Sequence, residues 1–153
     1  FKTKYLNSYP PAWILAEILP LGVLTSIYYN IKEISIKKKI AKEFGLQVKP
    51  FESWMSIVTL TRNACCHHSR VWNKQNTMLA MEPIHITRPW IRLQTDRLRI
   101  YFNLCIIKWF LDCISPNNTL KNKICKLIAD YPCIDISAMG FPADWLKEEL
   151  WKG

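Results

Sequence analysis

A short segment near the middle of the chain combines residue types that can do acid–base and phosphate chemistry. Residues 61–73 read TRNACCHHSRVWN and contain two arginines, two cysteines, two histidines and two asparagines. Such a set is compatible with a metal site, a nucleophilic centre, a phosphate-binding site, or a polar helix face without chemical function. The spacing of the residues separates these interpretations.

The spacing disfavours both a metal site and a cysteine nucleophile. A tetrahedral zinc site takes pairs of ligands separated by about two to four residues, whereas Cys65, Cys66, His67 and His68 are consecutive and would point in different directions on a helix. Adjacent Cys and His side chains on a helix do not face each other, and no Gly-rich oxyanion turn accompanies them. We therefore expect no metal and no other cofactor. A solvent-facing polar helix without function stays open as the plain alternative.

A helix through this segment would gather its polar groups on one side. We predict a helix from Pro50 to Arg70, with an inner face of Trp54, Ile57, Val58, Thr61 and Cys65. The opposite, polar face would hold Glu52, Ser56, Thr59, Asn63, His67 and Arg70. Asn63 and His67 would lie about 40° apart around the axis, with Arg62 between the polar and apolar faces.

The rest of the chain predicts an all-α fold, a helical bundle in one domain covering residues 1–153. Apolar periodicity favours helices at 36–44, 96–114 and about 119–129, the last with Leu120, Ile124, Leu127 and Ile128 inward. Short helical turns are expected near 137–140 and 144–151. Residues 71–90 lack this periodicity and contain Asn and Pro, so a long irregular connection should follow the motif helix.

Residues 12–29, AWILAEILPLGVLTSIYY, are apolar enough to suggest a membrane span. Glu17, Pro20 and Gly22 lie centrally, however, and a carboxylate beside a helix-breaking proline is costly within a bilayer. We predict a buried, kinked core helix and no membrane contact.

Charge and cysteine usage bear on the partner and the compartment. Lys and Arg number 21 against 12 Asp and Glu, a net charge of +9, which favours a polyanionic partner but is also explained by solubility. On the basic helix 36–44, which Gly45 should end, Lys38 and Lys39 are candidate phosphate contacts or part of a solvated face.

Six cysteines without a preceding secretory signal suggest buried free thiols and a cytoplasmic location. Because the chain begins at Phe1, we expect it to be part of a longer protein.

The motif resembles a known nuclease signature. Arg62-Asn63-x-x-x-His67 is similar to the pattern of the HEPN (higher eukaryotes and prokaryotes nucleotide-binding) superfamily, all-helical domains that include many metal-independent ribonucleases. The longer string Arg62-Asn63-x-Cys65-x-His67-His68-Ser69-Arg70-x-Trp72-Asn73 resembles bacterial abortive-infection proteins of the AbiD/AbiF type. The segments Pro10-Pro11-Ala12-Trp13 and Met139-Gly140-Phe141-Pro142-x-x-Trp145 also resemble that family, so the likeness covers nearly all of the chain. Ala64 and Cys66 depart from it at positions outside the motif.

The resemblance implies a HEPN-like bundle that is the C-terminal part of a longer protein and cleaves RNA by attack of its own 2′-hydroxyl. His67 would be the general acid or base, Arg62 the phosphate clamp and Asn63 an orienting group, in a site composed across a homodimer. His68 and Arg70 would bind the RNA backbone or support the fold. On charge alone, Lys38 and Lys39 are further candidates for RNA contact, and a regulatory RNA or an antitoxin could be a further partner. The alternative is a catalytically silent HEPN-like module that binds RNA or protein. We expect Trp72 to pack rather than stack on bases, and His85 to have no catalytic role.

Overall fold

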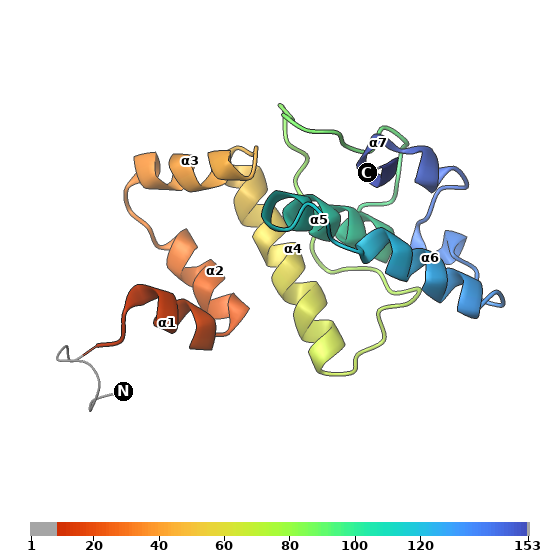
Figure 1. Cartoon of the computed structure of the whole chain (residues 1–153), viewed down its shortest axis with the longest axis horizontal. Helices are drawn as coiled ribbons and strands as arrows, with labels where there is room; N and C mark the ends of the chain where they lie inside the picture. The colour runs from red at the N-terminus through yellow and green to blue at the C-terminus, as the bar shows by residue number, and fades with distance from the viewer. Residues whose placement is uncertain (1–8, 153) are drawn as a thin grey trace.

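The computed structural model describes residues 9–152, which form seven α-helices, two 3-10 turns and no strand (Figure 1). The described part of the chain thus confirms the all-α prediction. The helices are α1 (Ala12–Ile18), α2 (Leu21–Tyr29), α3 (Ile34–Glu43), α4 (Val48–Cys66), α5 (Ile100–Ile114), α6 (Leu120–Asp130) and α7 (Glu149–Lys152). The two turns are η1 (Ser137–Met139) and η2 (Trp145–Lys147), close to the short helical turns expected near the end of the chain.

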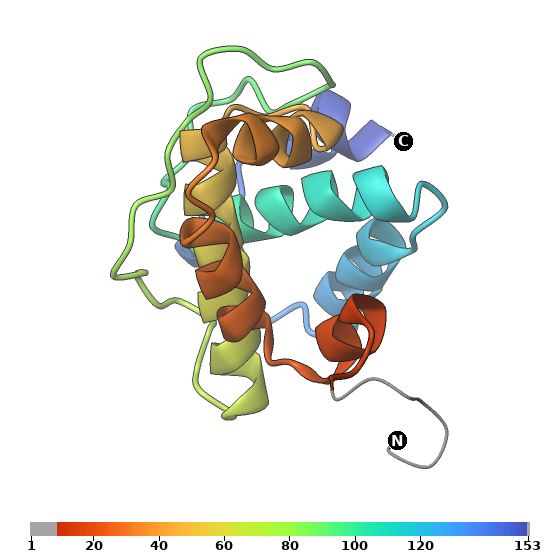
Figure 2. The same cartoon turned by 90° about the vertical axis from the view of Figure 1, so that its left-hand side faces the viewer.

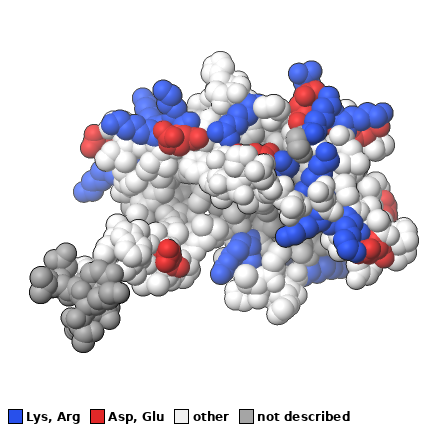
Figure 3. All heavy atoms as spheres, in the orientation of Figure 1, with Lys and Arg blue, Asp and Glu red and all other residues white. Residues whose placement is uncertain are grey.

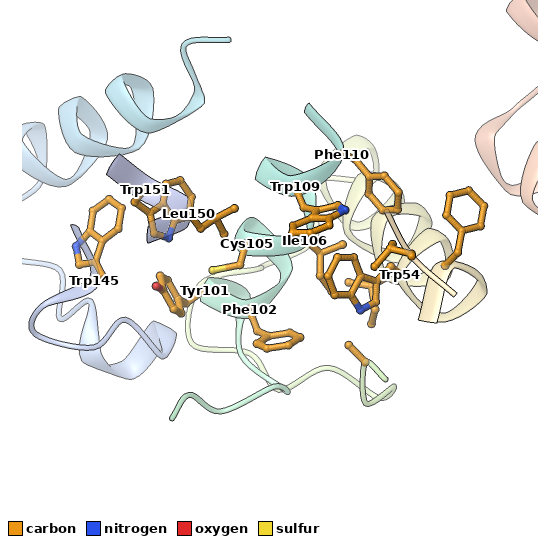
Figure 4. Packing of buried hydrophobic residues seen from close by; sticks show 14 of the residues in the cluster. Trp54, Tyr101, Phe102, Cys105, Ile106, Trp109, Phe110, Trp145, Leu150 and Trp151 are labelled. Carbon is orange, nitrogen blue, oxygen red and sulfur yellow. The ribbon is translucent and has the colours of Figure 1, made fainter. Parts of the chain in front are cut away.

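The core lies between the two longest helices, α4 and α5, which cross near the centre of the molecule (Figures 1 and 2). Trp54 of α4 and Trp109 of α5 are fully buried, and their rings meet edge to face with centroids 5.7 Å apart. Trp90, from the irregular connection, stacks on Trp54 at 4.7 Å. A second aromatic group surrounds Tyr101 at the other end of α5 and includes Trp145 and Trp151 (Figure 4). These apolar contacts fix the crossing of α4 and α5.

Helices α2 and α3 pack on the N-terminal part of α4 through polar contacts. The hydroxyl groups of Thr25 and Thr59 share a hydrogen bond of 3.1 Å, and Lys37 Nζ lies 2.7 Å from Glu52 Oε1. The predicted exposed face of the motif helix is therefore wrong at Glu52, which is 6% exposed. The reason is that α3 covers this face and supplies a cation to the carboxylate.

The predicted core helix at residues 12–29 is wrong in two respects. The segment is two helices, because Leu19 is extended (φ −78°, ψ 138°) before Pro20, the residue that precedes α2. Helix α1 contains no buried residue, and Trp13 and Ile18 are 61% and 68% exposed. Among the described helices, none combines the length and the apolar character that crossing a membrane requires.

Other boundaries differ by a few residues from those expected. The irregular connection is confirmed and extends to Arg99, because α5 begins only at Ile100. The inner face of α6 is centred on Ile124, whereas Leu127 is 57% exposed, against our prediction. The six cysteines are free thiols, but only Cys105 is fully buried; Cys65, Cys66 and Cys133 are exposed, so the prediction of buried thiols is wrong for these three.

Candidate active site

The three candidate catalytic residues lie at the C-terminal end of α4. Arg62 and Asn63 belong to its last turns, and His67 is the C-cap residue. The helix ends at Cys66 rather than at Arg70, because Ser69 N donates to Ala64 O (2.8 Å) and His68 N to Cys65 O (3.1 Å). This pair of bonds is a Schellman motif, which requires a left-handed residue after the cap. His68 takes that conformation at φ 51°.

Asn63 connects the other two motif residues. Its side-chain oxygen accepts a hydrogen bond of 3.2 Å from Arg62 Nη1, and its backbone oxygen accepts one of 2.9 Å from His67 N. Arg62 and His67 are exposed and Asn63 is half-buried. In the described part of the chain the ion pairs are made by other cations, so the Arg62 guanidinium keeps its charge available to a ligand.

A buried polar network supports α4 one residue before Arg62. Asn103 of α5 is 2% exposed and donates to Thr61 Oγ1 at 2.9 Å, while its oxygen accepts from Asn76 Nδ2 at 2.9 Å. The network ties α4, α5 and the connection together behind the motif. Sequence reasoning missed it, and the available signal was an amide, Asn103, inside the apolar run of α5.

The surface around the motif is basic. The chain has no Asp or Glu between Glu52 and Glu82, and this interval contains Arg62, Arg70 and Lys74. Lys and Arg side chains are visible beside the C-terminal end of α4 in the space-filling view (Figure 3). Exposed cations favour a polyanionic ligand.

The predicted phosphate contacts divide into two groups. His68 and Arg70 are exposed directly beyond the end of α4, next to His67. Lys38 and Lys39 are exposed on α3, which is joined to α4 near Glu52 by the Lys37 ion pair. Glu52 is about 22 Å along the helix axis from His67 at 1.5 Å per residue. The structure therefore does not bring Lys38 and Lys39 together with the motif within one subunit.

Trp72 and His85, which lie outside the motif, are both exposed. Trp72 is 40% exposed and lies outside the hydrophobic core, so the subunit covers only part of the indole. The tight turn at His68 and the anchored Asn73 leave this indole at the surface. His85 is exposed, and its backbone oxygen accepts from Gln47 Nε2 (2.9 Å) at the opposite end of α4.

The motif occupies an open surface of the subunit. Hollows of about 690 Å³ and 500 Å³ lie elsewhere, and neither is lined by Arg62, Asn63 or His67. A small cavity of about 90 Å³ lies between the last turns of α4 and the following loop, and is lined by residues including Thr61, Ala64, Val71, Lys74 and Asn76. Within residues 9–152, no three His, Cys, Asp or Glu side chains are grouped closely enough to hold a metal ion. Any enclosed site would need atoms from a second molecule.

One family model matches the first part of the chain. Residues 1–73 match the family of Abi-like proteins. The match supports an Abi-like family for this chain. The Abi-like region runs through α1 to α4 and ends at Asn73, so it includes Arg62, Asn63 and His67. Neither the curated proteins nor the solved structures gave a match.

Proposed function

We propose that this chain is a metal-independent endoribonuclease of bacterial abortive-infection defence, with a HEPN-type active site shared by two copies. The match of residues 1–73 to Abi-like proteins supports the defence role. The observation that carries the catalytic part is the surface position of Arg62, Asn63 and His67 at one end of α4. There Arg62 and His67 are exposed and can contact a polyanion.

The proposed reaction uses the RNA's own nucleophile. A base removes the proton of a 2′-hydroxyl, the 2′-oxygen forms a bond to the adjacent phosphorus, and the bond from phosphorus to the 5′-oxygen breaks. An acid protonates the departing 5′-oxygen, leaving a 2′,3′-cyclic phosphate and a 5′-hydroxyl. Histidine titrates near neutral pH and can fill either role, so one His67 acts as the base and the second copy's His67 as the acid. The Arg62 guanidinium stabilises the charge that develops on the phosphorane.

The geometry of α4 explains why one subunit is insufficient. Residues five apart on a helix are rotated by about 140°, so Arg62 and His67 leave the axis in different directions. In-line transfer needs an acid and a base on opposite sides of one phosphate. A second α4 lying against the first supplies the missing pair, and the cleft forms between the two helices.

Exposed apolar side chains beside the motif supply the proposed dimer interface. Leu60 lies two residues before Arg62 and is 43% exposed. Val23 and Ile27 of α2 are 42% and 49% exposed, and α2 is held beside α4 by the hydrogen bond between Thr25 and Thr59. Burial of these side chains against a second copy would stabilise the association.

The decisive experiment is an RNA-cleavage assay in EDTA. His67→Ala and Arg62→Ala should each lower the rate by about 100-fold or more, because acid–base and charge-stabilising groups contribute on that scale. His85→Ala is the matched control, since His85 is an exposed histidine at the other end of α4. Products should carry 2′,3′-cyclic phosphate ends, to be read by mass spectrometry.

The same assay separates the competing explanations. Undiminished cleavage by His67→Ala or Arg62→Ala refutes the assignment, and 3′-hydroxyl products indicate another reaction. RNA binding without turnover by the unmodified protein would instead support a catalytically silent binding module.

A further inference from the structure

The connection that follows α4 presents three exposed side chains from a firmly anchored loop. Arg70, Trp72 and Lys74 alternate with residues that contact the protein, and all three are exposed. Val71, between the first two, is half-buried and lines a small cavity together with Thr61, Ala64 and the exposed Lys74. In the sequence, the indole lies between two exposed cations.

The loop is held on both sides of this group. Before it, the Schellman bonds fix Ser69 to the end of α4. After it, Asn73 adopts a left-handed conformation (φ 47°) and its side-chain oxygen accepts from Arg99 Nη1 at 2.9 Å. Asn76 N donates to Leu98 O at 2.7 Å. The anchors are backbone and amide groups, so the indole is oriented without being buried.

We propose that Trp72 is a stacking platform for an unpaired base of the RNA substrate, with Arg70 and Lys74 binding the phosphates on either side of that base. This inference rests on the proposed function and deepens it by naming single-stranded RNA as the substrate class. Aromatic side chains interleaved with cations bind single strands because every base has a π-face and every linkage carries a negative charge. Bases in a duplex are already stacked and cannot reach such a platform.

The position of the group relative to the motif fits this role. Trp72 follows His67 by five residues, and the intervening chain turns sharply at His68. Trp72 is outside the hydrophobic core, and 40% of its surface is exposed to a ligand. No acidic residue occurs in the sequence between Glu52 and Glu82, and the carboxylate of Asp96, which lies near the loop, is paired with Arg99.

The test measures the affinity of the full chain for a fluorescent single-stranded RNA of about ten nucleotides by anisotropy. All proteins carry His67→Ala so that the RNA stays intact. Trp72→Ala should weaken single-strand binding by about 5- to 150-fold, the range that loss of one stacked base predicts, and Trp72→Phe by less. Trp13→Ala, which removes an exposed indole of α1, should leave binding unchanged.

Two further measurements sharpen the result. A duplex of the same sequence should bind equally well to the parent and to Trp72→Ala, because it offers no free base. Arg70→Gln and Lys74→Gln should each reduce the slope of log affinity against log salt by about 0.7, the value for one phosphate contact on a single strand. Lys126→Gln on α6 is the control, since this exposed lysine pairs with Asp130.

The inference is overturned if the parent binds no single-stranded RNA, if Trp72→Ala binds like the parent, or if duplex and single-strand affinities fall together. It is also overturned if Trp72→Ala changes the molecular mass in sedimentation, because the indole would then be an interface residue. Cleavage by the protein with His67 intact separates the two proposals. His67-dependent cleavage without a Trp72 effect removes the platform alone, whereas a Trp72 effect without any cleavage removes the nuclease proposal alone.

Discussion

Asn103 Nδ2 donates a 2.9 Å hydrogen bond to Thr61 Oγ1, and both residues are buried at the crossing of α5 and α4. The contact fixes α4 one residue before Arg62. Since Asn103 also accepts a hydrogen bond from Asn76, the same amide holds the loop that carries Trp72. The side chain of Asn103 therefore holds both the motif helix and the loop in place.

Replacement of this amide should destabilise the protein and disturb the motif. Asn103→Ala leaves the Thr61 hydroxyl and the Asn76 amide without partners, which should lower the free energy of unfolding by about 1–3 kcal/mol. Urea unfolding measures the loss. Thr61→Val removes the hydroxyl with little change in shape, and in the double variant the two effects should be less than additive because they act on one contact. Additive losses would show that the contact carries no coupling energy.

The buried ion pair between Lys37 and Glu52 should be costly to break on one side only. Glu52 is 6% exposed, and Lys37 Nζ also donates to Tyr29 O at 2.8 Å. Lys37→Met strands the carboxylate and should lower stability by about 3–5 kcal/mol. Thermal and urea unfolding of Lys37→Met, and of the same variant combined with Glu52→Leu, should show that the double change is milder than the single one.

The ion pair between Lys49 and Glu52 provides a control, because it involves the same carboxylate. Lys49 Nζ is 3.7 Å from Glu52 Oε2, but the Lys49 side chain is 80% exposed. Lys49→Ala should cost less than about 1 kcal/mol, because solvent screens an exposed pair. An equal loss from Lys49→Ala and Lys37→Met would contradict the assigned difference in burial.

A charge at Leu60 should prevent the proposed association. Leu60→Asp places a carboxylate at an exposed apolar position of α4 in the proposed interface, where it would lose hydration in a dimer. Sedimentation should show a monomer and the cleavage rate should fall in parallel, while the unfolding free energy changes little. Leu127→Asp on α6 is the matched control, because Leu127 is 57% exposed and far from α4 in sequence. Cleavage by a monomeric Leu60→Asp variant would rule out the shared site.

Burial of the Cys105 thiol should make the free energy of unfolding decrease at alkaline pH. Burial raises the pKa of this thiol from 9.0 to about 12. The unfolded chain loses the proton first, so the contribution of the neutral thiol is complete below pH 9.0 and is lost as pH rises from 9.0 towards 12. The loss should be about 1.4 kcal/mol per pH unit in that window.

Urea unfolding at a series of pH values tests this dependence. Cys105→Ala should remove that part of the slope, although it also lowers stability at every pH by leaving a cavity. Cys133→Ala, at an exposed thiol, should keep the wild-type slope. Identical slopes for wild type and Cys105→Ala would show that Cys105 does not ionise on unfolding.

Much of the fold could be predicted from local pattern. The helical character of the chain, the irregular connection after the motif helix and the ending of α3 at Gly45 follow from apolar spacing and from the positions of Gly and Pro. Gly45 takes φ 68°, the left-handed conformation that favours glycine, and donates to Lys42 O at 2.8 Å. These properties depend on neighbours in sequence, so the sequence reveals them.

Burial and the end of the motif helix could not be predicted in this way. Glu52 is buried because α3 supplies Lys37, and α4 ends early because a histidine adopts a conformation usual for glycine. Helix α1 is exposed because no other element within residues 9–152 covers it. The resemblance of residues 62, 63 and 67 to the Arg-Asn-x-x-x-His motif predicted phosphate chemistry from the sequence alone. Their exposure, the support from Asn103 and the free surface of Trp72 were decided by the tertiary structure, because each depends on which distant segments pack together.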